Sequence, residues 1–265
     1  MISLSCYSEY MKKLFSTRWR ISFQVLPFII LILLAKLVVH SQGWEFITLS
    51  SLFTALISAN IFLIGFLISG VLVDYKEAEK IPGDMATSLE TLADECRILL
   101  ESKQADSAKK CLTHVMYLSN LILDWFHKKE RSATIMAELT KLNSYFLLFE
   151  NLTQANFIVR MKQEQSSLRR LVNRANTIRE TSFNRSGYTI AEIISFFLIV
   201  GLVLTRLDPF YENVFFVTFV SFILIYMIML IKDLDNPFEH YIQNKETADE
   251  ASLKPLLDLK NRLEY

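Results

Sequence analysis

The apolar residues of this chain are gathered into four long blocks, and this distribution constrains the fold more than any other feature. The blocks are Ile21–Val39, Phe46–Val73, Gly187–Thr205 and Asn213–Ile231. As helices, the shorter blocks span roughly 28 Å, about one hydrocarbon core of a bilayer. The second block holds no charge and spans roughly 42 Å, so this helix must tilt or project beyond the membrane. The sequence therefore predicts four transmembrane helices.

The four blocks form two hairpins separated by a long polar region. In that region the apolar residues recur at helical spacing, without strand-like alternation, which indicates a helical bundle. Pro82 in "KIPGD" should end the extension of the second block, because proline cannot continue a helix interior. We expect an all-α integral membrane protein with five parts: an N-terminal segment (1–20), a first transmembrane hairpin (21–73), a cytoplasmic helical bundle (74–186), a second hairpin (187–231) and a tail (232–265).

The bundle should bury four apolar stripes, one on each of its helices. The first three stripes are regular and the fourth is looser. They consist of Leu89, Leu92, Cys96 and Leu99; Leu112, Val115, Leu118 or Ser119, Ile122, Trp125 and Phe126; Leu139, Leu142, Tyr145, Phe146, Phe149 and Leu152; and Phe157, Met161, Leu168, Leu171 and Val172.

The positions of Lys and Arg predict the orientation in the membrane. The segment before the first block carries Lys12, Lys13, Arg18 and Arg20. The turn of the first hairpin has no Lys or Arg, and the turn of the second has only Arg206. Since these cations favour the cytoplasmic side, we expect a multi-pass protein of the cell (inner) membrane with both termini cytoplasmic. A cleaved signal peptide fits less well, because the first block is long and "VVHSQGW" lacks a small-residue cleavage site.

One face of the second block carries small, hydroxylated and aromatic residues. On a helical wheel they lie within about 80° of one another, with Phe66 at the edge and Asn60 on the opposite side. The face consists of Ser51, Thr54, Ser58, Phe62, Gly65, Phe66 and Ser69. A pore-lining helix with a hydrophobic collar would have this pattern, because such collars gate by dewetting. One chain has too few spans to enclose a channel, so a pore requires a ring of copies.

Polar and small residues within the spans can also serve the packing of the helices. Small residues at spacings of three or four are the usual surface for close helix packing in lipid, so the face alone leaves pore lining and packing open. Glu192 is an intramembrane carboxylate and hence a functional candidate, but "TIAE" also fits a capping box at a helix start, which we favour. Lys36 is expected to extend its ammonium group toward the outer surface.

The layout and three short stretches resemble the bestrophin superfamily. "RWRISF" (Arg18–Phe23) is similar to the Trp-Arg-Gly-Ser stretch that leads into that family's first span. "GF" at Gly65 and Phe66, followed by "EAEKIPG" (Glu77–Gly83), resembles its Gly-Phe-Arg and Glu-Ala-Arg…Trp-Gly elements. "DNPFE" (Asp235–Glu239) is similar to the Glu-Asn-Pro-Phe-Gly that follows its last span.

The resemblance implies a homopentamer with the second span along its axis and Phe62 and Phe66 in a hydrophobic neck. It also implies a tail that turns at Asn236, Pro237 and Phe238, runs along the outside of the bundle and contacts a neighbouring subunit. The alternative for this turn is a plain Asn-Pro helix stop, with Phe238 extended toward the membrane.

The sequence also departs from the family pattern. Leu67 and Glu79 replace arginines of the family motifs and Pro82 replaces a tryptophan, which suits the remote, bacterial-type branch. No acidic run follows Phe238, so the calcium clasp of the animal members is not expected.

Several function classes lack support. The formal net charge is zero, which does not favour nucleic acid. The three cysteines show no CxxC spacing and the four histidines no HExxH motif, so we expect reduced thiols, no metal and no cofactor. No catalytic constellation can be named, so an enzyme is not expected.

The sequence thus favours a homopentameric ion channel with a phenylalanine neck in the second span. Its expected partners are the bilayer, further copies of the chain and permeant ions. The alternative is a non-conducting membrane scaffold whose bundle recruits a partner.

Overall fold

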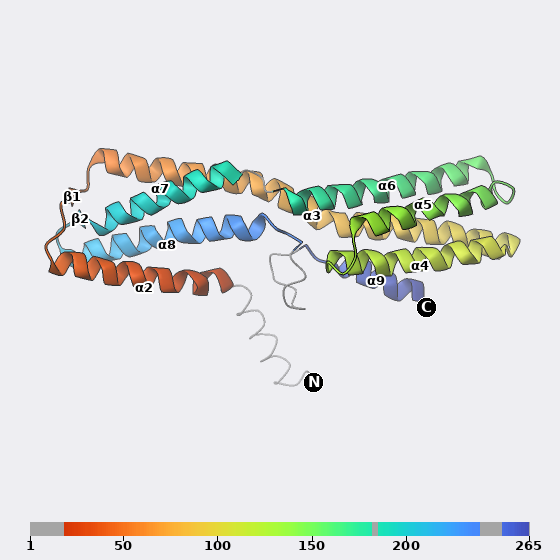
Figure 1. The fold of residues 1–265 in the computed structure, drawn as a ribbon, viewed down its shortest axis with the longest axis horizontal. Coiled ribbons are helices and arrows are strands. Elements are labelled where there is room, and N and C mark those ends of the chain that lie inside the picture. Colours follow the sequence, from red (N-terminus) through yellow and green to blue (C-terminus); the bar gives the residue numbers. More distant parts are fainter. Residues whose placement is uncertain (1–18, 182–184, 239–250, 265) are drawn as a thin grey trace, which may run out of the picture. The chain divides into compact units, whose positions relative to one another are not determined.

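The structure, a computed structural model, describes residues 19–181, 185–238 and 251–264, and these are almost entirely helical (Figure 1). Lys12, Lys13, Arg18, Cys6 and the segment directly after Phe238 lie outside the described residues. In chain order the elements are α2 (Arg20–Ser41), β1 (Ile47–Thr48), α3 (Ser51–Lys103), α4 (Asp106–Phe126), α5 (Ser132–Phe149), α6 (Ala155–Glu180), α7 (Arg185–Val203), β2 (Thr205–Arg206), α8 (Phe210–Leu234) and α9 (Lys254–Glu264).

The described chain divides into two compact units, each built from two stretches distant in sequence. The first unit contains residues 19–73 and 185–235, and the second contains residues 74–181, 236–238 and 251–264. The first unit therefore holds α2, the beginning of α3, α7 and α8. The second holds the rest of α3 with α4, α5, α6 and α9.

Four of the described helices are long and apolar enough to cross a membrane, which confirms the predicted all-α membrane fold. They are α2, α3, residues Ser186–Val203 of α7, and α8. The second span begins at Ser51 rather than at Phe46. The reason is that Ile47 and Thr48 form a short parallel bridge with Thr205 and Arg206, which joins the turns of the two hairpins.

The spans of the first unit pack around α8, against which both α2 and α7 lie. α2 buries Ile21, Val25, Ile29 and Ile32, which share one face at helical spacing, and this face meets Leu202 and Val217. A second cluster joins Ile64, Leu67 and Val71 of α3 to α7 and α8. Elsewhere the spans expose large apolar side chains, as expected of surfaces that contact lipid.

The second unit is a helical bundle with one continuous apolar core. The stripes predicted on its helices are mostly buried there, including Leu89, Leu92, Leu139 and Val172. Leu112, Tyr145, Leu152 and Leu171 are only partly buried against the core. Phe157 is exposed, so its assignment to the core was wrong; it lies in the first turn of α6.

Pro82 does not end α3, and that prediction was wrong. The helix continues to Lys103, with Pro82 inside it. Proline removes one helical hydrogen bond and crowds the carbonyl of Ala78. However, Ala78, Ile81 and Met85 are all buried in the bundle core on either side of the proline, so packing holds the backbone helical through this position.

Truncating a buried leucine of α3 should destabilise the bundle. Leu92→Ala removes a fully buried side chain and should lower the free energy of unfolding by about 2–5 kcal/mol, because it leaves a cavity. Leu147→Ala on α5 is the matched control, since this leucine is 68% exposed. Denaturant unfolding in detergent, monitored by circular dichroism, measures the free energy of unfolding of the two variants. Equal losses for the two variants would contradict this core assignment.

Candidate functional site

The seven residues of the predicted pore face lie on the side of α3 that no other part of the described chain covers. Phe62 is 78% exposed and Phe66 is 63% exposed, and the five small residues around them are also exposed. Ile64, Leu67 and Val71 lie on the other side of the same helix and are buried. The structure thus leaves uncovered the face that the helical wheel selected, together with neighbouring apolar residues such as Leu52 and Leu56.

Glycine positions show where close packing occurs in this unit. A Cβ atom added at Gly65 would meet nothing within 4 Å, whereas one added at Gly201 would lie 2.8 Å from the ring of Phe53. The close helix approach is therefore at Gly201, between α7 and α3. The small residues of the α3 face are not used for packing within the described chain.

Two of the hydroxyl groups on this face donate hydrogen bonds to carbonyls of the preceding turn. Thr54 Oγ1 donates to the carbonyl of Ser50 (3.2 Å), and Ser58 Oγ donates to the carbonyl of Thr54 (3.0 Å). Each hydroxyl keeps acceptor capacity that can face outward. Thr54 and Ser58 can therefore offer acceptor oxygens to water while their own donors are satisfied.

Asn60 lies on the opposite side of α3, as the wheel predicted. It is 1% exposed, and its Nδ2 donates to Ser195 Oγ on α7 (2.7 Å). This buried hydrogen bond fixes the rotation of α3 against α7, which helps to hold the uncovered face outward.

The tail turn places Phe238 inside the bundle core of its own chain. Its ring is fully buried, 5.4 Å from the ring of Phe126, and the guanidinium of Arg179 lies 5.9 Å from it. Pro237 is also buried, and its carbonyl accepts a hydrogen bond from Ala251 N (2.9 Å). The alternative of Phe238 extended toward the membrane was wrong. A subunit contact made by the tail stays a prediction, and the Phe238 side chain is not free to make it.

Beyond the turn, α9 packs on the bundle. Its Leu256, Leu259 and Leu263 join the same core, and Arg262 pairs with Glu90 of α3 (2.8 Å). The chain after the turn thus forms part of the second unit.

Lys36 does not extend toward the surface, and that expectation was wrong. Its side chain is completely buried, and Nζ donates to Glu45 Oε1 (2.7 Å) and to the backbone carbonyls of Val203 (3.1 Å) and Thr205. A charge is tolerated here because an opposite charge and two carbonyls replace its hydration. Sequence reasoning missed this site, because Glu45 and Thr205 are brought to Lys36 only by the folded hairpin turns.

Further polar groups complete this cluster. Asn213 Nδ2 donates to the Thr205 carbonyl (2.9 Å), and His40 Nδ1 lies 3.1 Å from Glu45 Oε2. Partial burial of Glu45 disfavours its charged form. Hydrogen bonds and charge from Lys36 and His40 outweigh that effect and lower the pKa of this carboxyl. The cluster ties the turns of both hairpins together.

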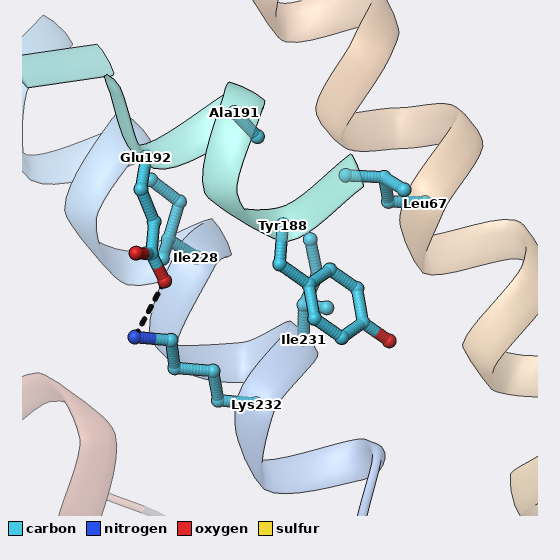
Figure 2. Close-up of a pocket in the computed structure, with 7 residues that line it drawn as sticks. All are labelled: Leu67, Tyr188, Ala191, Glu192, Ile228, Ile231 and Lys232. Atoms are coloured by element: carbon cyan, nitrogen blue, oxygen red, sulfur yellow. Dashed lines mark ion pairs between the residues drawn. The ribbon is translucent and has the colours of Figure 1, made fainter. Parts of the chain in front are cut away.

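Glu192 is not a capping residue, so that expectation was also wrong. α7 begins at Arg185, which places Glu192 well inside the helix, where it pairs with Lys232 of α8 (2.6 Å; Figure 2). The capping pattern failed because the helix starts four residues before Thr189. The open alternative, an intramembrane carboxylate with a partner, agrees with this geometry.

The family-like "EAEKIPG" stretch contains an ion pair of the second unit. Arg174 on α6 donates from Nε to Glu77 Oε1 (2.8 Å) and from Nη2 to Asp74 Oδ1 (3.2 Å). The hydrogen bond from Arg174 is the main cause that lowers the pKa of Glu77, against the opposing effect of burial. The pair joins α3 to α6 at the start of the bundle.

Metal ligands do not converge anywhere in the part of the chain that the structure describes: no group of three or more His, Cys, Asp or Glu side chains could hold an ion. Cys96 and Cys111 are both free and buried there.

Comparison with known proteins identifies the fold but no close relative. No family model matches the sequence, and no curated protein matches it. A structure of a bacterial bestrophin homologue from Klebsiella pneumoniae, carrying a tyrosine-to-alanine mutation, matches with a TM-score of 0.76 and 15% identity over 91% of this chain and 97% of that chain. A second structure of that homologue, solved by zinc phasing, gives 0.76 and 15% over 89% and 95%. The chain therefore has a bestrophin-like fold, which confirms the predicted remote resemblance.

Removing one partner of the buried ion pair should destabilise the first unit. Glu45→Gln leaves the Lys36 ammonium buried without a countercharge and should cost about 3–5 kcal/mol. Lys36→Met/Glu45→Leu removes both charges and should recover much of that loss. The melting temperature in detergent measures both variants. If the melting temperature of Glu45→Gln is not lower than that of the double variant, the ion pair does not stabilise the contact between the hairpin turns.

The same pair should make stability pH-dependent with a defined sign. Because the folded state lowers the pKa of Glu45, its contribution is complete above the ordinary carboxyl value of 4.5 and is lost as the pH falls through the lower folded value. The difference in melting temperature between wild type and Lys36→Met/Glu45→Leu, measured from pH 7 downward, isolates this effect. A difference that stays constant down to about pH 3 would contradict it.

Truncating Phe238 should destabilise the bundle of a single protomer. Phe238→Ala deletes a fully buried ring and should cost about 3–5 kcal/mol. Phe238→Leu, which keeps most of the volume, should cost less. The free energy of unfolding in detergent and the oligomeric mass, measured on the same samples, test whether the ring stabilises its own protomer. Dissociation of an oligomer with unchanged protomer stability would show instead that the ring contacts another subunit.

Proposed function

We propose that this chain is the subunit of a homo-oligomeric ion channel in which α3 lines the water path. The observation that carries the proposal is the uncovered side of α3, where seven small, hydroxylated or aromatic residues are exposed while Ile64, Leu67 and Val71 on the other side are buried. The bestrophin-like fold supports it. That resemblance also implies that five copies surround the axis.

The order of residues along this face suits a conduit with a narrow apolar section. Ser51, Thr54 and Ser58 lie at one end and Ser69 lies at the other, so hydroxyl oxygens can contact water on both sides. Phe62 and Phe66 lie between them, one turn apart. In a ring of copies these phenyl groups would form a neck that gates by excluding water.

The proposed setting is the cell (inner) membrane with both termini in the cytoplasm, as the distribution of Lys and Arg favours. Ions would then cross the membrane along the axis of the oligomer. No cofactor is required for passive conduction of this kind.

Enlarging the neck should increase conduction. Purified wild-type protein in planar bilayers should carry current beyond that of empty lipid. Phe62→Ala/Phe66→Ala should raise single-channel conductance on the order of tenfold, which corresponds to lowering the barrier by about 1.4 kcal/mol. The reason is that smaller side chains let water occupy the neck.

Phe215→Ala/Phe219→Ala is the matched control. It also removes two exposed phenylalanines four residues apart, but from α8, where their rings stack at 6.0 Å. Its conductance should equal that of wild type. If neither wild type nor the neck variant passes current while oligomers remain intact, the channel proposal fails, and the result favours the non-conducting scaffold.

A further inference from the structure

The exposed side of α3 continues beyond the predicted neck of Phe62 and Phe66. α3 is a single helix of 53 residues, Ser51–Lys103 (Figure 1). At 100° per residue, Lys76 and Lys80 fall within about 40° of Phe62 on the helical wheel. Both lysine side chains are exposed. A water path that follows this side of α3 would therefore pass two cations after the neck.

Within the second unit, α6 and α9 pack on the two flanks of α3 and leave the side with the lysine pair open. On one flank Glu77 pairs with Arg174 of α6, and on the other Glu90 pairs with Arg262 of α9. These flanks lie about 60–80° to either side of the lysine pair on the wheel. Thr87, midway between them, is exposed. The contacts of the bundle thus leave the lysine pair facing outward from α3.

The charges nearest the predicted neck on this side are both positive. Arg174 pairs with Asp74 and Glu77, and neither lysine forms an ion pair with another residue that the structure describes. Asp74, Glu77 and Glu79 lie about 80° or more from the centre of the lysine pair on the wheel. Asp84 lies nearer to that centre, but it is one turn farther from the neck than the pair. Two charges per chain therefore face outward without a countercharge beside them.

The lysine pair lies close enough to the neck to influence ions there. Lys76 follows Phe66 by ten residues, which is about 15 Å along the helix axis. Side chains on a helix lean toward its N-terminus, so the lysine side chains extend back toward the neck and shorten this distance. The remainder is on the order of the Debye length, about 8–10 Å at physiological ionic strength. Low-dielectric walls around a narrow path focus the field further.

We propose that Lys76 and Lys80 form a ring of ammonium groups beyond the neck and select anions as the permeant ions. This inference rests on the channel proposed above. In a ring of copies each protomer adds two positive charges. Their combined field raises the concentration of anions at the neck and lowers that of cations. The phenyl groups of the neck carry no charge that would oppose this preference.

Reversal potentials of the purified full-length protein in planar bilayers, measured under a KCl gradient, test the inference. Wild type should favour chloride over potassium by about tenfold in permeability. Lys76→Gln/Lys80→Gln should bring this ratio close to unity, and Lys76→Glu/Lys80→Glu should invert it. Lys76→Arg/Lys80→Arg keeps both charges and should retain the wild-type ratio. Raising the ionic strength on both sides should lower the wild-type ratio, because salt screens the field.

Lys109→Gln/Lys110→Gln is the matched control. It removes the same charge from two exposed lysines of α4 and should leave the permeability ratio unchanged. Equal reversal potentials for wild type and Lys76→Gln/Lys80→Gln would overturn the inference but leave the channel proposal standing. That result would favour contact of these lysines with anionic lipid headgroups. A wild type that passes no current would overturn the channel proposal, and this inference with it.

Discussion

The absence of water in the hydrocarbon core is the constraint on which this structure depends. Backbone groups there must be satisfied within the protein, so the first unit crosses the membrane as helices whose hydrogen bonds are internal. The same constraint explains Lys36. Its charge lies among spans, and it is stable there because Glu45 and two backbone carbonyls replace water around its ammonium. These ligands come from both hairpins, so satisfying one lysine also fixes how the hairpin turns meet.

The sequence predicts well those features that follow from local periodicity. The four spans, the buried stripe of Leu89 and Leu92, and the opposite faces of α3 all follow from the spacing of apolar residues along a helix. The face with Phe62 and Phe66 was selected in this way. In the structure, Ile64 and Leu67 on the other side of α3 are buried, and the selected face stays uncovered. That this face lines a pore stays a prediction.

Features that depend on distant parts of the chain escaped prediction. Glu45 and Val203 meet Lys36 only after folding, and Glu192 meets Lys232 only when α7 and α8 pack. At Pro82 a local sequence signal was present but gave the wrong prediction. Its local preference to end a helix is real, but packing of Ile81 and Met85 in the bundle outweighs it. The bridge between β1 and β2 is too short to leave a pattern in the sequence.

The interleaved order of the two units has a consequence for biosynthesis. Residues of the first unit both precede and follow those of the bundle, and α9, which supplies core leucines to the bundle, comes after α8. During translation α4, α5 and α6 must therefore wait for the whole second hairpin to be made before their core is closed. The nascent bundle would expose apolar surface for that time, and such surface favours aggregation.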